Sequence, residues 1–365
     1  MTNLSVFSFF SGIGFLDLGF EKSKFNVVYC NEIFKPFAEA YKYSRQQMGI
    51  SLPKYGIDVV GIDELFTIEN KKRLSKFIKE ESKDNITCFI GGPPCPDFSV
   101  GGKNKGEHGD NGRLSRSYID LITSHLPDIF LFENVKGLWR TKKHRQFYDE
   151  LKEVLELAGY SLTEKLINSI QYGAPQDRDR IILIGFKKKK FNILNKEKLH
   201  SHFDWNIGVK YKERDAFANF STISDSVVSR SHYELTVQHW FDKNQVTSHV
   251  NQQHCFIPRA AHSKFLVIKE GDDSRKSYKR LHRFRYSPTA AYGNNEVHIH
   301  PTQPRRITAA EALAIQSLPK NYQLPSNMTL TNMFKSIGNG VPFVAAKGIA
   351  TAIKNTIKLL NSVEK

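Results

Sequence analysis

Apolar runs alternate with amphipathic stretches along the first half of the chain, and this alternation predicts an α/β fold with a parallel sheet. Strands are expected where β-branched and aromatic residues run up to glycine, proline or polar residues, at 6–10, 26–30, 87–90, 127–135 and 181–186. Helices are expected between them, near 16–22, 34–48, 69–82, 115–125 and 144–158. Four consecutive apolar residues at 129–132 indicate a strand that is buried on both faces, as in a parallel sheet.

The pattern changes at the four lysines Lys187–Lys190. From there to about residue 304 the periodicity is poor, and His, Arg, Tyr and Asn are frequent. We therefore predict two domains, a larger one made of 1–186 and 305–365 and a smaller one made of 187–304. The larger domain would be closed by the C-terminal helix packing back on it.

Periodicity returns at 308–317, which reads as a helix. Thr308 with Glu311 three residues later forms a capping box, the usual start signal of a helix. The segment Ile337–Pro342 then precedes a last amphipathic helix that is expected to end near residue 360.

The composition is basic and narrows the choice of partner. The 365 residues include 53 Lys and Arg against 37 Asp and Glu, a formal net charge of +16. An excess of this size favours a polyanionic partner, usually nucleic acid, although many basic proteins bind none. The four cysteines lack the spacing of metal ligands, which predicts free thiols and no metal site. No apolar run reaches membrane-spanning length and the N-terminus has no signal-peptide pattern, so we expect a cytoplasmic protein with no membrane partner.

A glycine turn follows the first strand. Ser11–Gly14 lies between a strand and a helix, where glycines let the backbone approach a ligand. Glu32 ends the second strand twenty residues after Gly12, the offset at which a carboxylate can hydrogen-bond a ribose. These residues predict a cofactor site, with a plain tight turn as the alternative. Asp63, at the tip of a possible third strand at 57–63, is either part of that site or an exposed loop residue.

Two reactive side chains stand at the ends of predicted strands. Cys95 lies on the stiff, proline-rich turn Gly91–Ser99, and Glu133 ends the apolar run at 129–132. The bland alternatives are a buried structural cysteine and a carboxylate that caps a turn. Because ligands bind at the carboxyl ends of parallel strands, the two together predict an active site. The glycine-rich stretch 99–112 reads as a loop that could close over a substrate.

Two basic segments follow. Arg178 and Arg180 precede the strand at 181–186 and could contact an anion or a base carbonyl, or form a ladder of salt bridges with Asp177 and Asp179. Residues 275–286 mix basic and aromatic side chains and suit substrate reading, since Lys and Arg contact phosphates and Arg also contacts base edges.

In their order along the chain, these features resemble the motifs of DNA cytosine-5 methyltransferases of the bacterial restriction-modification type. The matching segments are Phe10–Gly14, Asn31–Glu32, Pro94–Cys95, Glu133–Val135, Gln176–Arg180, Arg306–Pro319 and Gly338–Pro342. The chain departs from the family pattern at positions that carry no chemistry, namely Ser8, Phe15, Pro96, Ala310, Ala314 and Ser336. The resemblance covers almost the whole chain. It implies a Rossmann-like sheet that uses S-adenosylmethionine, with a second, smaller target-recognition domain.

The resemblance also implies a role for individual residues. The Cys95 thiolate would add to C6 of a flipped cytosine while Glu133 supplies a hydrogen bond or a proton at N3. Arg180 would hold the base oxygen O2, and Arg178 would support the site. The S-adenosylmethionine site would comprise Phe10, Gly12, Ile13, Gly14, Asn31, Glu32, Ile33, Asp63, Pro94, Leu114, Asn339 and Val341. The DNA contacts would comprise Ser99, Lys103, Lys105, Arg113, Arg280, Arg283 and Arg285.

The partner that the resemblance implies is double-stranded DNA, with a companion restriction endonuclease by family analogy and the enzyme acting as a monomer. Two rivals are a cytosine methyltransferase that acts on tRNA and a non-catalytic DNA-binding relative. The long basic stretch 187–300 favours a duplex reader, and intact Cys95, Glu133 and Arg180 argue against loss of catalysis. A nicotinamide dehydrogenase shares only the glycine turn and Glu32, and is discounted.

Overall fold

A computed structural model describes residues 3–94, 110–140, 142–193, 199, 201–211, 232–258, 262–275, 277–290, 292 and 297–362. Four of the predicted site residues lie outside the described residues, namely Cys95, Ser99, Lys103 and Lys105. So does most of the predicted closing loop.

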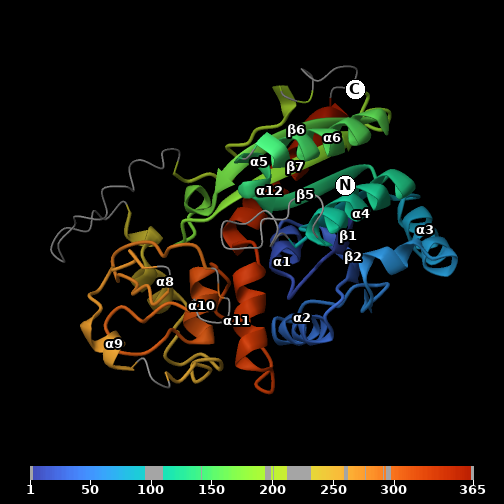
Figure 1. Cartoon of the computed structure of the whole chain (residues 1–365). Coiled ribbons are helices and arrows are strands. Elements are labelled where there is room, and N and C mark those ends of the chain that lie inside the picture. The colour runs from blue at the N-terminus through green and yellow to red at the C-terminus, as the bar shows by residue number, and fades with distance from the viewer. Residues whose placement is uncertain are drawn as a thin grey trace.

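A seven-stranded sheet forms the centre of the larger lobe (Figure 1). Its strands are β1 (Asn3–Phe9), β2 (Asn26–Asn31), β3 (Ile57–Asp58), β4 (Asn85–Gly91), β5 (Ile129–Val135), β6 (Tyr160–Asn168) and β7 (Asp179–Lys187). They lie in the order β3-β2-β1-β4-β5-β7-β6. The first five are parallel, and β7 pairs antiparallel with both β5 and β6. The predicted α/β fold is therefore confirmed, and the antiparallel end of the sheet is an addition to it.

Two strands differ from the sequence-based expectation. The strand expected at 57–63 is wrong beyond Asp58: only two residues pair with β2, and Gly61 then begins the 3-10 helix η1 (Ile62–Phe66). The Glu64 side chain stabilises this start by accepting from the Gly61 N–H at 2.8 Å. β6 was not expected, because its side chains mix charged and apolar residues and its partner β7 lies later in the chain.

Amphipathic helices cover both faces of the sheet. One face packs against α1 (Phe15–Lys22), α2 (Lys35–Gln47) and α12 (Phe343–Ser362). The other packs against α3 (Ile68–Glu81), α4 (Asp110–His125) and α6 (Lys142–Leu157). Each helix turns its apolar stripe to the sheet, so both faces are buried, as the parallel strands β1 to β5 require. Among the described residues, no helix combines the length and apolarity needed to cross a lipid bilayer.

A second lobe lies beside the sheet in Figure 1. Its apolar core is shared with the glycine turn, α1 and α2 of the larger lobe, which contribute Ile13, Phe15, Leu18, Phe37 and Ala40. The second lobe is built from short elements: η5 (Tyr233–Leu235), α8 (Val237–Lys243), α9 (His262–Val267), α10 (Ala309–Ile315) and α11 (Leu330–Asn339). The capping box predicted for α10 is present, with Glu311 N–H donating to Thr308 Oγ1 at 3.2 Å and Thr308 N–H donating to the Glu311 carboxylate at 2.8 Å. α11 was not expected from the sequence.

Apolar packing crosses both predicted domain boundaries. Phe191, Leu199 and Phe203 lie after the tetralysine boundary, yet they pack in the core of the sheet. Helices α10 and α11 lie after residue 304, yet they pack in the core of the second lobe. The C-terminal helix α12 does return to the sheet, where it covers one face beside α1. The predicted boundaries came from the composition of 187–304, and composition does not reveal which core these residues pack in.

Candidate active site

The sheet order creates one edge at which several loops converge. β1 and β4 are neighbours, although the chain passes from β1 to β2 on one side and from β4 to β5 on the other. Such a reversal of strand order opens a crevice at the carboxyl ends of the strands, where ligands bind in open α/β sheets. This edge carries the glycine turn after β1, Glu32 after β2, Pro94 after β4 and Glu133 near the end of β5. Cys95 follows Pro94 directly in the sequence.

Glu133 and Arg180 form a nearly buried ion pair at this edge. Arg180 Nε lies 2.7 Å from Glu133 Oε1, and each side chain is about one-tenth exposed. Arg180 is positioned by the antiparallel pairing of β7 with β5, which sets Glu133 opposite Ile182 and Val135 opposite Arg180. Because alternate residues share a face, both side chains continue the apolar face of Leu131 and Ile182.

Gly92 brings the exit of β4 against the same carboxylate. A Cβ atom on Gly92 would come within 2.5 Å of Glu133 Oε2, so only glycine permits this approach. The chain that leads to Cys95 therefore passes directly beside the Glu133 carboxylate.

Arg178 has a structural role. Its guanidinium is buried and donates to the carbonyls of Ala290 at 3.0 Å and Gly338 at 2.8 Å. Burial, together with the neighbouring charge of Arg180, lowers the pKa of Arg178 well below its ordinary value. These carbonyls belong to the second lobe and to α11, so Arg178 joins them to the start of β7. Arg178 donates to carbonyls and Arg180 pairs with Glu133, so each guanidinium has a partner other than the suggested ladder with Asp177 and Asp179.

The glycine turn and Glu32 form the second part of the site. Gly12 and Gly14 have positive φ angles of 56° and 83°, and no atom lies within 4 Å of where a Cβ on Gly12 would stand. Glu32 accepts the N–H of Gly12 at 2.8 Å and that of Phe34 at 2.8 Å. Burial raises the pKa of Glu32, and these two amides oppose that shift. An open glycine backbone beside a fixed carboxylate fits a nucleoside cofactor.

Other predicted cofactor residues surround this turn. Phe10 meets the ring of Tyr118 edge-on at 6.1 Å, and Ile33 is two-thirds exposed. Asn31 is buried and donates to the Val60 carbonyl at 2.8 Å, which fixes the loop beyond β3. Four more differ in exposure, with Val341 buried, Leu114 partly buried, and Pro94 and Asn339 exposed.

Asp63 is held by two side chains of α4. Ser117 Oγ donates to its carboxylate at 2.6 Å, and Arg113 forms an ion pair with it. Arg113 was predicted to contact DNA, whereas the structure brings it to the predicted cofactor residue. Ser117 gave no signal in the sequence, because a serine on an amphipathic helix is ordinary.

Two further residues hold the glycine turn by donating hydrogen bonds to its backbone carbonyls. Arg45, on α2, is fully buried; it donates to the Gly14 carbonyl at 2.7 Å and pairs with Glu21 at 2.9 Å. Tyr322, from the second lobe, donates to the Ile13 carbonyl at 2.5 Å. Arg45 lies four residues after the buried Tyr41, so its place on an apolar helix face was a usable signal. Tyr322 offered none, because it lies far from the turn in sequence.

The buried pair of Arg45 predicts a large stability effect. Replacing Arg45 by Met leaves the Glu21 carboxylate buried without its partner, which is expected to lower the free energy of unfolding by about 3–5 kcal/mol. The matched control is Arg116→Met, since the ion pair of Arg116 with Glu150 is half exposed and contributes less than about 1 kcal/mol. Urea denaturation of the three proteins measures both effects. Equal losses in the two variants would contradict the structural role given to Arg45.

The three arginines predicted to read DNA differ in their surroundings. Arg280 is buried and donates to several carbonyls, including those of His300 at 2.9 Å and Gln303 at 3.0 Å. Arg283 forms a two-pronged pair with Glu270, at 3.0 and 3.1 Å. Arg285 is partly exposed. Arg280 thus uses its donors inside the lobe, and its contact with DNA stays a prediction.

The sheet and its crevice define a Rossmann-like α/β protein with a candidate ligand site at the carboxyl edge. Solved structures share this fold: a putative DNA modification methyltransferase from an Escherichia coli prophage has a TM-score of 0.69 at 20% identity, covering 98% of this chain and 100% of that one. The Schizosaccharomyces pombe Dnmt2 methyltransferase has a TM-score of 0.59 at 15% identity, over 98% and 100% of the two chains.

The chain belongs to the C-5 cytosine-specific DNA methylase family, whose model matches residues 4–355. It is 57% identical to the Type II methyltransferase M.NmeDI of Neisseria meningitidis serogroup C, over 97% of this chain and 84% of that protein. It is 27% identical to M.FnuDI of Fusobacterium nucleatum, over 99% and 97% of the two chains. The resemblance, fold class and enzyme class predicted from the sequence are confirmed.

Proposed function

We propose that this chain methylates C5 of a flipped cytosine in a specific duplex DNA sequence, with Cys95 as nucleophile and Glu133 and Arg180 acting on the base. The observation that carries this assignment is the Glu133–Arg180 pair at the carboxyl edge of the sheet, beside the backbone that leads to Cys95. A target atom inside a duplex can be reached only when its base leaves the stack.

The residue types suit the chemistry. Carbon 5 of cytosine is a weak nucleophile, so electrons must first be pushed into the ring. The Cys95 thiolate forms a bond to C6, and N3 takes a proton from Glu133, which gains that proton from solvent once its pair with Arg180 has opened. Both changes make C5 electron-rich. A thiolate both adds and leaves readily, so loss of the C5 proton and departure of Cys95 restore the ring after methylation.

Arg180 and Glu133 already satisfy each other before any base arrives. In the proposed complex Arg180 turns to the base oxygen O2 and Glu133 to N3, so the two groups exchange their mutual contact for contacts with the substrate. Arg178 stays in place, because both of its carbonyl partners belong to the protein.

S-adenosylmethionine, when bound, supplies an electrophilic methyl group. Gly12 and Gly14 would let it approach the backbone closely, and Glu32 would hold its ribose. Phe10 would stack on the adenine, and Asp63 would bind the adenine amino group. The open space over Gly12 and the fixed Glu32 carboxylate support this placement. We further propose a monomeric, cytoplasmic enzyme that is paired with a restriction endonuclease.

Transfer of a tritiated methyl group separates duplex DNA from tRNA as the substrate. The purified chain is expected to label plasmid DNA at least about a hundredfold faster than tRNA, because its basic second lobe suits an extended duplex. Preference for tRNA would overturn the DNA assignment while leaving the catalytic residues standing. Absence of transfer to both would indicate a non-catalytic relative.

A further inference from the structure

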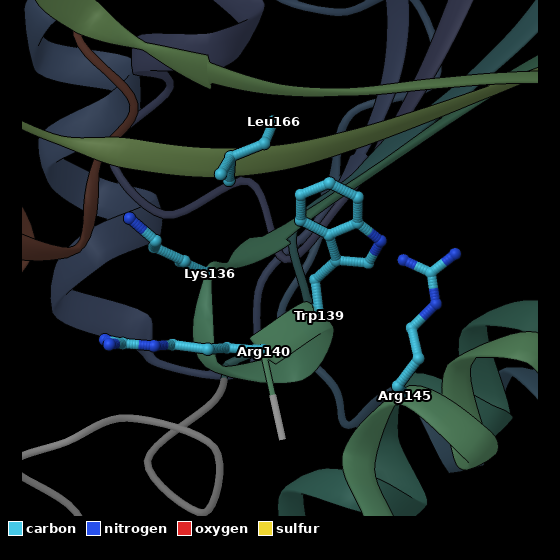
Figure 2. A pocket seen from close by; sticks show the side chains of 5 residues that line it. All are labelled: Lys136, Trp139, Arg140, Arg145 and Leu166. Carbon is cyan, nitrogen blue, oxygen red and sulfur yellow. The ribbon is translucent and has the colours of Figure 1, made fainter. Parts of the chain in front are cut away.

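A surface pocket lies beside the catalytic edge but outside the site described above. It has a volume of about 540 Å³ and is lined by Lys136, Trp139, Arg140, Arg145 and Leu166. Figure 2 shows these side chains rising from three places: the chain that leaves β5 with α5 (Gly137–Arg140), the start of α6, and β6. Three of the five carry a positive charge and one is an indole. This combination suits a phosphate with an adjoining sugar or base.

Two of the cations are held in place by acidic partners. Lys136 Nζ lies 2.7 Å from Asp179, and Arg145 contacts Asp149 at 3.2 Å and Glu164 at 3.3 Å. Arg145 also lies over the Trp139 ring, 5.1 Å from its centroid, which fixes one face of the indole. The framework of the pocket is therefore ordered before any ligand arrives.

Arg140 differs from the other two cations. Its side chain is exposed, and it forms no hydrogen bond or ion pair with the part of the chain that the structure describes. In Figure 2 it extends away from Trp139 along the rim of the pocket. Trp139 is itself 37% exposed, a high fraction for an indole. A cation available for pairing and an exposed aromatic side chain thus share the rim of one pocket.

The pocket is coupled to the catalytic pair through the backbone. Lys136 comes three residues after Glu133, and its partner Asp179 directly precedes Arg180. Val135 and Arg180 face each other in the β5–β7 ladder, so the pocket and the catalytic pair lie at the same end of these strands. They lie on opposite faces of the sheet there, because Leu166, which lines the pocket, pairs with Ile181, the residue next to Arg180.

We propose that the pocket binds the DNA strand next to the flipped cytosine, with a backbone phosphate on Arg140 and the adjoining sugar or base against Trp139. This inference rests on the proposed function and adds a contact that carries no sequence information, since phosphate contacts set the register of the duplex. It commits to DNA because the pocket lies at the same edge of the sheet as the base-binding pair and the chain carries a net charge of +16.

Salt dependence of DNA binding tests the proposal. The duplex carries the sequence that the wild-type chain methylates, and fluorescence anisotropy measures Kd from low to moderate salt. Loss of one phosphate contact in Arg140→Gln is expected to reduce the slope of log Kd against log salt by about 0.9. Trp139→Leu is expected to weaken binding about fivefold or more with no change of slope. The control Lys72→Gln removes one charge from an exposed position of α3, at the other end of the sheet, and is expected to change neither quantity.

The outcomes separate the inference from the function on which it rests. If the wild-type chain methylates the duplex but Arg140→Gln keeps the slope and affinity of Lys72→Gln, the pocket does not bind DNA. If a free mononucleotide binds the wild-type pocket and leaves DNA affinity unchanged, the occupant has been wrongly assigned. If the wild-type chain transfers no methyl group to DNA, the proposed function fails first. Thermal melts of each variant check that a loss of binding does not reflect a loss of folding.

Discussion

Replacement of Cys95 by serine is expected to abolish methyl transfer, with a loss on the order of 10⁴-fold or more in kcat. Serine keeps the size of the side chain but carries a hydroxyl that stays protonated near neutral pH, so it cannot add to C6 as a thiolate does. DNA affinity is expected to change little, because the proposed duplex contacts lie elsewhere. Single-turnover methyl transfer together with a DNA-binding isotherm measures the two effects separately.

The matched control for this variant is Cys255→Ser. Cys255 lies in the second lobe, where its thiol donates to the Arg306 carbonyl at 3.1 Å and partial burial raises its pKa. It is a free cysteine far from the catalytic edge, so its replacement is expected to leave kcat within about twofold of the wild type. Wild-type rates in Cys95→Ser would refute the nucleophile assignment. Equal losses in both variants would point to damage of the fold.

Glu133→Gln has the second largest expected effect, a fall of about 10²–10⁴-fold in kcat. The amide can still accept the Arg180 N–H through its oxygen, but it cannot give a proton to N3 of the base. The loss should therefore fall on kcat with little change in KM for DNA, since the contact is used only in the reaction. Methyl-transfer kinetics at varied DNA concentration separate the two parameters.

Glu164→Gln is the control for this substitution. Glu164 lies on β6 and pairs with Arg145 and Lys152, so the same change of charge is made on the same sheet at a residue that takes no part in the proposed chemistry. Because Arg145 lines the proposed pocket, the comparison is made on kcat and not on DNA affinity. A rise in KM for DNA with no fall in kcat in Glu133→Gln would show that Glu133 contributes to binding and not to the chemical step. A similar fall in kcat for Glu164→Gln would show that the loss comes from a general disturbance of the sheet and not from a specific role of Glu133.

The sequence predicted those parts of the site whose positions follow from local pattern. The apolar run at 129–132 placed Glu133 at the end of a buried strand, and Gln176–Arg180 placed Arg180 at the start of another. Their meeting did not follow from these local predictions, because the start of β7 reaches the carboxyl end of β5 only when β7 runs antiparallel, and the sequence pattern did not predict that direction. The capping box of Thr308 and Glu311 was equally local, and it stands at the start of α10.

The features that were missed depend on contacts between distant segments. Tyr322 reaches the Ile13 carbonyl across more than 300 residues, and Phe191 and Phe203 pack into the sheet from beyond the apparent domain boundary. Periodicity reports which side of an element is buried, but it does not report which element covers that side. Arg280 shows the same limit from the other side: a basic residue in a basic segment suggested DNA, and the sequence pattern gave no sign that its donors reach carbonyls within its own lobe.

Bisulfite sequencing of plasmid DNA from cells that express this chain tests the central claim most directly, with Cys95→Ser expressed in parallel. The wild-type chain is predicted to protect one cytosine in every copy of a short fixed sequence, and the variant is predicted to protect none. Full conversion of all cytosines by bisulfite in the wild-type sample, or the same protection in both samples, would contradict the account.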